Sequence, residues 1–477
     1  MGTSSASDNP VAPRDRWSLH SALALLGGAL LMLWPALLNR YPLLYPDSIT
    51  YLGDGRPVAR ALFLHKFSDY YGIRSFFYSL GILPFHWNQT AWPIIVLQSL
   101  LAAYVLWQVV RSFHPRRTAL PYLILVASLS LLTSMAWFVC LIMPDVLGPL
   151  LYLCIYLLVF APETLSRTER LVLMLIAWWG VTSHATHFAL ASGLCLLLAM
   201  LWALRLPALR GRLSQVLQVA AIILCAAAAQ IALHAYLYGQ PSLNGERPPF
   251  LTARVIADGP GLWYLQQHCP EAQVKAKFVL CDHLKELPQD PDEFLWGEKG
   301  IWSQADEDTG LRIRQEETAF VLATLRAYPR AQLSKSAANF WQQLQTFGLY
   351  LFGPSDWMSE QFPTVLPREH SQYLAARQAQ NALPLEFFTS VQNWTVIASL
   401  VVIIVFAALL RVRRQPKLLG LALVITSTVL ANALVTGAMS LVEDRLQSRV
   451  VWLVPFLAGI LISLWLRHEG FEIRRKV

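Results

Sequence analysis

Ten apolar runs divide this chain of 477 residues, and they constrain its fold more than any other feature. In an α-helix about 20 residues, each rising roughly 1.5 Å, cross a hydrocarbon core of about 30 Å. We therefore expect an all-α polytopic membrane protein with about ten transmembrane helices. The two runs between 171 and 206 are short and nearly continuous, which leaves open either two short helices or one broken helix. The runs lie at 17–38, 91–110, 119–142, 146–162, 171–187, 189–206, 216–238, 393–410, 418–441 and 450–466.

The charged residues support this class. They make up 14% of the chain, whereas a soluble globular protein carries about 25%. The formal net charge is +8, and the basic residues cluster between apolar runs, as Arg111, Arg116 and Arg117 do. Ten spans would place these clusters on one side of the membrane, which the positive-inside rule makes the cytoplasm. We therefore expect both termini in the cytoplasm and no nucleic acid partner.

Two insertions on the opposite side define the expected domains. The N-terminal transmembrane module, residues 1–240, contains a first external loop at 39–90, whose mixed apolar and polar stretches indicate helices lying in the membrane interface. Residues 241–392 are expected to form a mostly helical external (periplasmic) domain, and 393–477 a C-terminal transmembrane module. Cys269 and Cys281 lie together in the external segment, where an oxidising compartment favours a disulfide between them.

Two carboxylates follow apolar runs closely and are the strongest candidates for chemistry. Asp47 comes shortly after the first run, and Asp145 directly follows the third. An ionisable group near hydrocarbon is costly unless it is paired or hydrated, so each is a functional candidate. The alternative is that each caps a helix. We expect Asp47 to be a general base for a hydroxyl nucleophile, which is compatible with a capping role.

Basic residues and histidines lie on the same predicted side as the two acids. Arg445 and Arg449 break the positive-inside pattern, and two arginines four residues apart can clamp a phosphate. Their alternative partners are the neighbouring Glu443 and Asp444. Lys66 and other basic residues of the first loop, such as Arg74, would favour an anionic substrate.

His184 and His187 flank a predicted external turn. Two histidines three residues apart can share one side of a helix, but two ligands alone do not make a metal site. The two histidines therefore have either a structural role or a role in binding a substrate or a metal. Asp54 and Asp69 are either metal ligands or solvated, and we favour solvation because no ligand spacing accompanies them. No nucleotide-binding motif is present, and the cofactor stays unknown, with a divalent metal as one option.

These features resemble the GT-C superfamily of integral-membrane glycosyltransferases. Its members have many spans, a large first external loop with interfacial helices, and an acidic motif after the first membrane helix. The tetrapeptide Tyr45–Ser48 matches that motif, and Met143–Asp145 matches a second acid found in the next external loop. Arg445 and Arg449 resemble the basic residues that members place near the donor phosphate. The first motif holds one carboxylate where many members have two, so a metal requirement is left open.

The resemblance implies a polyprenyl-phosphate sugar donor and an inverting transfer on the periplasmic side of a bacterial inner membrane. The acceptor would be a glycan, lipid or protein of the cell envelope. Asp47 would act as base and Asp145 would orient the acceptor. A transporter or flippase of a lipid-linked or anionic solute, and a non-catalytic envelope-assembly subunit, are the alternatives. The residues expected to bind substrate are Tyr45, Lys66, His184, His187, Arg445 and Arg449.

Overall fold

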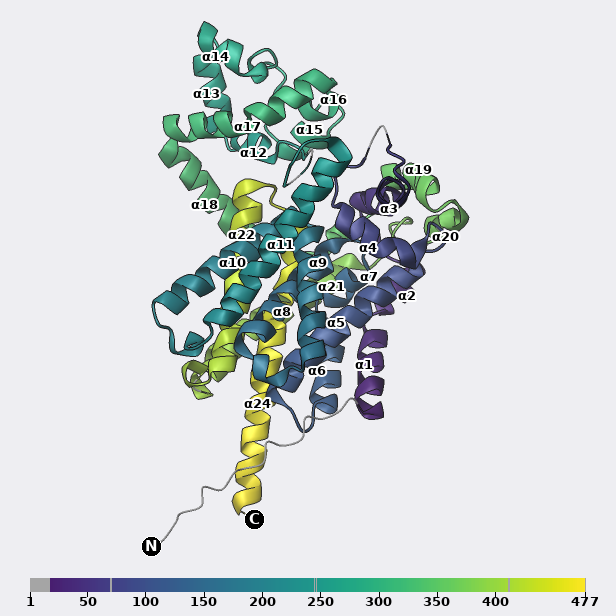
Figure 1. The fold of residues 1–477 in the computed structure, drawn as a ribbon, viewed down its shortest axis with the longest axis vertical. Coiled ribbons are helices and arrows are strands. Elements are labelled where there is room, and N and C mark those ends of the chain that lie inside the picture. The colour runs from purple at the N-terminus through teal and green to yellow at the C-terminus, as the bar shows by residue number, and fades with distance from the viewer. Residues whose placement is uncertain (1–17, 69–70, 244, 246, 411, 477) are drawn as a thin grey trace.

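The structure, a computed structural model, describes residues 18–68, 71–243, 245, 247–410 and 412–476. Helices dominate these ranges (Figure 1), and their β pairing is limited to an isolated parallel bridge between Leu43 and Leu141. The all-α class is therefore confirmed for the described part of the chain. Asp69 lies outside it.

Seven helical segments of the described residues are long and apolar enough to cross a membrane, which supports a multi-pass membrane protein. Three further apolar helices are shorter, at 10–17 residues, and they fall where the sequence predicts full spans or an interfacial helix. The expected number of ten spans is thus not confirmed. The seven segments are Leu19–Asn39, Trp92–Phe113, Ala185–Ala203, Leu213–Tyr238, Leu385–Leu409, Pro416–Met439 and Asp444–Arg467.

The α-helices are labelled as in Figure 1. Those of the N-terminal part are α1 (Leu19–Leu31), α2 (Trp34–Asn39), α3 (Pro46–Leu64), α4 (Phe76–His86), α5 (Trp92–Phe113), α6 (Ala119–Leu132), α7 (Met135–Cys140), α8 (Leu147–Phe160), α9 (Arg167–Ser183), α10 (Ala185–Ala203) and α11 (Leu213–Tyr238). The short 3-10 helix η1 (Pro144–Val146) precedes α8.

The remaining helices belong to the polar segment 241–392 and to the C-terminal part of the chain. They are α12 (Phe250–Ala257), α13 (Pro260–His268), α14 (Ala272–Lys277), α15 (Pro291–Trp296), α16 (Ile301–Gln304), α17 (Glu307–Ala327), α18 (Pro329–Gln345), α19 (Asp356–Val365), α20 (His370–Leu374), α21 (Leu385–Leu409), α22 (Pro416–Met439), α23 (Asp444–Val451) and α24 (Leu453–Lys476).

A break in the third apolar run carries the chain toward the candidate site. α6 ends at Leu132, and Thr133 adopts an extended conformation with φ −138° and ψ 173°. The Thr133 hydroxyl donates to the carbonyl of Leu129 at 2.5 Å and accepts from the Met135 N–H at 3.3 Å. A threonine side chain can replace helical backbone bonds in this way. α7 then leads to extended Leu141, which pairs with Leu43 and brings the two acidic motifs of the sequence close together.

The polar segment 241–392 contributes to two hydrophobic cores. Buried residues between 253 and 320, including Phe278 and Phe294, form a core of their own. Phe352 and Phe362 belong instead to the main core of the bundle. Figure 1 shows the helices α12–α17 beyond one end of the bundle, with α18 leading back toward α22. We call this part the α12–α17 unit.

A disulfide between Cys269 and Cys281 closes a loop inside the α12–α17 unit, the pairing that the sequence favours, with the two Cα atoms 5.5 Å apart. Replacing both cysteines by serine should reduce the stability of this unit by about 3 kcal/mol, because the unfolded loop is then less restricted. Limited proteolysis of the purified protein should show faster cleavage within the unit and unchanged cleavage of the bundle. Cys225→Ser, at an exposed free cysteine, is the matched control, and equal cleavage of all variants would contradict the prediction.

Candidate functional site

Charged side chains from distant parts of the chain meet near the end of the bundle that faces the α12–α17 unit. Asp47 of α3 accepts a hydrogen bond from Arg74 Nη2 through its Oδ1 atom at 2.6 Å. Its other oxygen, Oδ2, lies 3.5 Å from Nη1 of Arg445 on α23. Arg449, one turn further along α23, lies 3.4 Å from Asp145 of η1. We call these five residues the acid–arginine cluster.

The local sequence explains how Asp47 is presented. Pro46 is the first residue of α3, a position that suits proline because its missing N–H is not needed there. The Tyr45 N–H donates to the Ser48 hydroxyl at 2.9 Å. Asp47 therefore lies in the first turn, where the helix dipole favours an anion. The alternative prediction that Asp47 is the N-cap residue is wrong, because Tyr45 takes that position.

Asp145 and Arg449 form the buried half of the cluster, each only 1% exposed. Arg449 Nη2 also donates to Asn432 Oδ1 at 3.0 Å, and Asn432 donates to Gln447 Oε1 at 2.8 Å. A buried ion pair is stable only when such additional hydrogen bonds satisfy its remaining atoms. The Asp145 side chain makes no cap bond to α8, so its alternative role as a helix cap is not what the structure shows.

Arg445 is nearly buried yet incompletely bonded. Its guanidinium carbon lies 4.2 Å from the centre of the Tyr45 ring, a cation–π contact. Within the described chain its Nε and Nη1 atoms have no hydrogen-bond partner, and neither has Oδ2 of Asp145. Buried donors without acceptors are costly. The Nε and Nη1 atoms of Arg445 are therefore available as hydrogen-bond donors to an anionic ligand, although Nη1 is also the atom that forms the ion pair with Asp47.

The two histidines lie beside the cluster. Their rings are 5.2 Å apart, and His187 is buried with its Nδ1 atom 3.1 Å from the carbonyl of Gly180. A Cβ atom at Gly148 would lie 2.7 Å from His187 Nε2, so glycine permits this close approach. His187 interacts electrostatically with Arg449 and Asp145. No group of three potential metal ligands occurs among the residues that the structure describes.

Other expected residues have different placements. Lys66 is exposed, and the contacts described for it are limited to its backbone N–H, which donates to the Arg60 carbonyl. Arg445 and Arg449 pair with Asp47 and Asp145 rather than with the adjacent acids considered above. In the sequence Arg74 is one of several basic residues of the first loop, and nothing in its local sequence separates it from the others.

The Asp54 side chain is not solvated as the sequence analysis expects. Its Oδ1 atom accepts a hydrogen bond from the Gly72 N–H at 3.2 Å, and its Oδ2 atom is buried without a hydrogen bond in the described chain. Burial raises the pKa of the Asp54 carboxyl to about 6. The expectation is therefore wrong, because the loop after α3 returns over this side chain and removes it from water.

The α12–α17 unit reaches the cluster through α15. The ring centre of Trp296 lies 5.5 Å from the guanidinium carbon of Arg74. Asp292, on the same helix, interacts electrostatically with Tyr45. A polar ligand bound at Asp47 would therefore also lie close to this unit.

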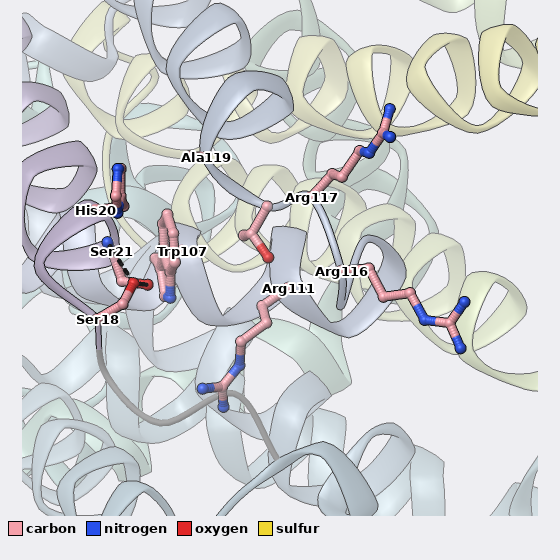
Figure 2. A pocket seen from close by; sticks show the side chains of 9 residues that line it. Ser18, His20, Ser21, Trp107, Arg111, Arg116, Arg117 and Ala119 are labelled. Atoms are coloured by element: carbon pink, nitrogen blue, oxygen red, sulfur yellow. Dashed lines mark hydrogen bonds between the residues drawn. The ribbon is translucent and has the colours of Figure 1, made fainter. Parts of the chain in front are cut away.

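A second basic site lies at the opposite end of the bundle, near the start of α1 (Figure 1), around a cavity of about 190 Å³. Figure 2 shows the guanidinium groups of Arg116 and Arg117 extending away from Trp107, which lines the same cavity. Arg111 donates to both carboxylate oxygens of Glu169, at 2.7 and 2.9 Å. These arginines do not converge on one ligand position, so the acid–arginine cluster is the better candidate.

Comparison with known proteins gives no relative: no protein-family model, no curated protein and no solved structure matches the chain. The case for a function therefore rests on the cluster and on its position in the bundle.

Arg449→Met should lower the free energy of unfolding by about 3–5 kcal/mol, because it leaves the Asp145 carboxylate buried without its cation. The double variant Asp145→Leu, Arg449→Met should recover most of that loss. Thermal unfolding in one detergent at one protein concentration measures both effects, with the exposed Arg330→Ala as control. A double variant no more stable than the single one would show that the unpaired charge is not the cause.

Asp54→Asn should be more stable than the wild type at neutral pH. A carboxyl whose pKa is raised by folding contributes stability below its ordinary pKa, and that contribution is lost as the pH rises through about 6. The melting temperature of the variant should therefore rise relative to that of the wild type as the pH increases from about 4 to about 7. A melting-temperature difference that stays constant over this range would contradict the shift.

Proposed function

We propose that this protein is a membrane glycosyltransferase that moves a sugar from a polyprenyl-phosphate donor to a cell-envelope acceptor on the periplasmic side. The acid–arginine cluster supplies the two groups that this reaction needs at one place, a carboxylate for a proton and cations for a phosphate. The family resemblance of the two acidic motifs supports the same reaction.

The observation that carries the proposal is the state of Arg445. This side chain is 9% exposed and its Nη1 atom stands 3.5 Å from Asp47 Oδ2, while neither Nη1 nor Nε has a hydrogen-bond acceptor among the described residues. A phosphate presents several acceptor oxygens, which suits arginine donors. A bound phosphate competes with Asp47 for the Arg445 guanidinium and thereby releases the Oδ2 oxygen of Asp47, while Oδ1 stays bonded to Arg74.

In the proposed reaction the acceptor hydroxyl gives its proton to Asp47 while its oxygen attacks the anomeric carbon of the donor. The bond between this carbon and the phosphate oxygen breaks, and its electron pair leaves with polyprenyl phosphate. Attack opposite to the leaving group inverts the configuration at the sugar. Negative charge grows on the phosphate in the transition state, so Arg445 binds it more strongly there than in the donor.

The remaining residues have supporting roles in this proposal. The buried pair of Asp145 and Arg449 holds α23 in place and so orients Arg445. His187 packs against the same pair. The α12–α17 unit, which contacts Arg74 through Trp296, lies where an acceptor approaches Asp47, and we assign it the choice of acceptor.

Asp47→Asn should reduce turnover by about 10²–10⁴-fold, because the amide keeps the size of the side chain but cannot take the proton. Purified wild type and variant would be offered a panel of polyprenyl-phosphate sugars, and release of polyprenyl phosphate would be measured. Asp356→Asn, at an exposed acid of α19, is the matched control.

Two outcomes would contradict the proposal. Equal turnover by a correctly folded Asp47→Asn variant would remove Asp47 as the base. A wild type that acts on none of the donors would instead favour a transporter or a non-catalytic assembly subunit.

A further inference from the structure

Asp54 lies two turns after Asp47 on α3 and takes no part in the proposed transfer. Residues seven apart in an α-helix share a face, about 10 Å apart along the axis. One oxygen of Asp54 has a single donor, the Gly72 N–H, and the other is buried without a hydrogen bond within the described chain. A buried carboxylate with so few partners reduces stability, so its presence calls for a role.

Two residues near the end of the loop after α3 bond to carboxylates of this helix. Gly72 donates to Asp54, and Arg74, two residues later, donates to Asp47 at 2.6 Å. Ser75 then donates its hydroxyl to the Thr182 carbonyl of α9 at 2.7 Å. The bond at Asp54 thus anchors the chain two residues before Arg74.

Gly72 contacts α3 at a distance that only glycine allows. A Cβ atom built at this position would lie 2.3 Å from Asp54 Oδ2 and 2.5 Å from Thr50 Cγ2. Both distances are far below van der Waals contact, so a side chain there would force either the loop or the side chains of Asp54 and Thr50 to move. The hydrogen bond and the close approach both place Gly72 directly beside Asp54 on α3.

We propose that Asp54 is a positioning residue for Arg74. Its hydrogen bond to Gly72 fixes the loop on α3, and the loop then holds the Arg74 guanidinium against Asp47. The consequence for turnover rests on the proposed function of Asp47, whereas the consequence for the loop does not. The buried carboxylate of Asp54 lowers the stability of the fold, and in return it fixes the Arg74 cation beside the proposed base, Asp47.

The loop itself can be tested without any substrate. Hydrogen–deuterium exchange of the peptide containing Gly72 would be compared between wild type, Asp54→Ala and Asp54→Asn. We expect Asp54→Ala to raise the exchange rate of the Gly72 amide about ten-fold, the effect of losing one hydrogen bond. Asn keeps an acceptor oxygen and should stay within about three-fold of wild type. Arg60→Ala, at an exposed residue of the same helix, is the control.

Gly72→Ala tests the same contact from the side of the loop, because its Cβ atom would collide with the side chains of Asp54 and Thr50. It should raise exchange in the same peptide as Asp54→Ala does. Exchange at the wild-type rate in both Asp54→Ala and Gly72→Ala would overturn the proposal, whatever the protein does with a sugar donor.

The link to Arg74 is tested by turnover in two backgrounds. Asp54→Ala should lower turnover in the wild-type background, and Asp54→Asn should restore much of it. In an Arg74→Ala background the same Asp54→Ala change should have no further effect. An equal loss in both backgrounds would show that Asp54 does not act through Arg74. Absence of turnover by wild type would count against the proposed function and would leave the exchange experiment to decide on Asp54.

Discussion

Two arginines one helical turn apart on α23 hold together the end of the bundle that carries the cluster. Charged groups are stable away from water only when each has a partner, so the position of one fixes the position of the other. Arg445 is paired with Asp47 of α3, and Arg449 with Asp145 of η1. The short helix α23 thereby determines how the start of α3 and the start of α8 are arranged around it.

The sequence was sufficient for the all-α membrane class and singled out four of the five residues of the acid–arginine cluster. Long apolar runs predict membrane helices even when the packing of those helices is unknown. An ionisable residue close to an apolar run is a functional candidate, because placing its charge near hydrocarbon costs free energy. This argument selects Asp47, Asp145, Arg445 and Arg449. What the sequence could not supply was the pairing, since no local pattern indicates which acid meets which arginine. The neighbouring Glu443 and Asp444 were equally reasonable partners on sequence grounds.

The helix break at Thr133, the burial of Asp54 and the position of Arg74 depend on tertiary structure. Thr133 adopts an extended conformation inside an apolar run that composition alone indicates as continuous, and its hydroxyl takes the Met135 N–H. The burial of Asp54 is set by the return of a loop and not by its neighbours in sequence. Arg74 became part of the cluster through that same loop. Such contacts arise when segments fold back on one another, and periodicity along a single helix carries no information about them.

The pairing of residues so far apart in the chain has a consequence for how the protein is made. Asp145 and Arg449 are 304 positions apart, and synthesis at about 5–20 residues per second leaves roughly 15–60 s between their appearances. During that interval the first helices enter the bilayer with a carboxylate whose counterion does not yet exist. The nascent bundle must meanwhile keep Asp145 hydrated or protonated, so the charged centre is completed only when the last membrane segment arrives.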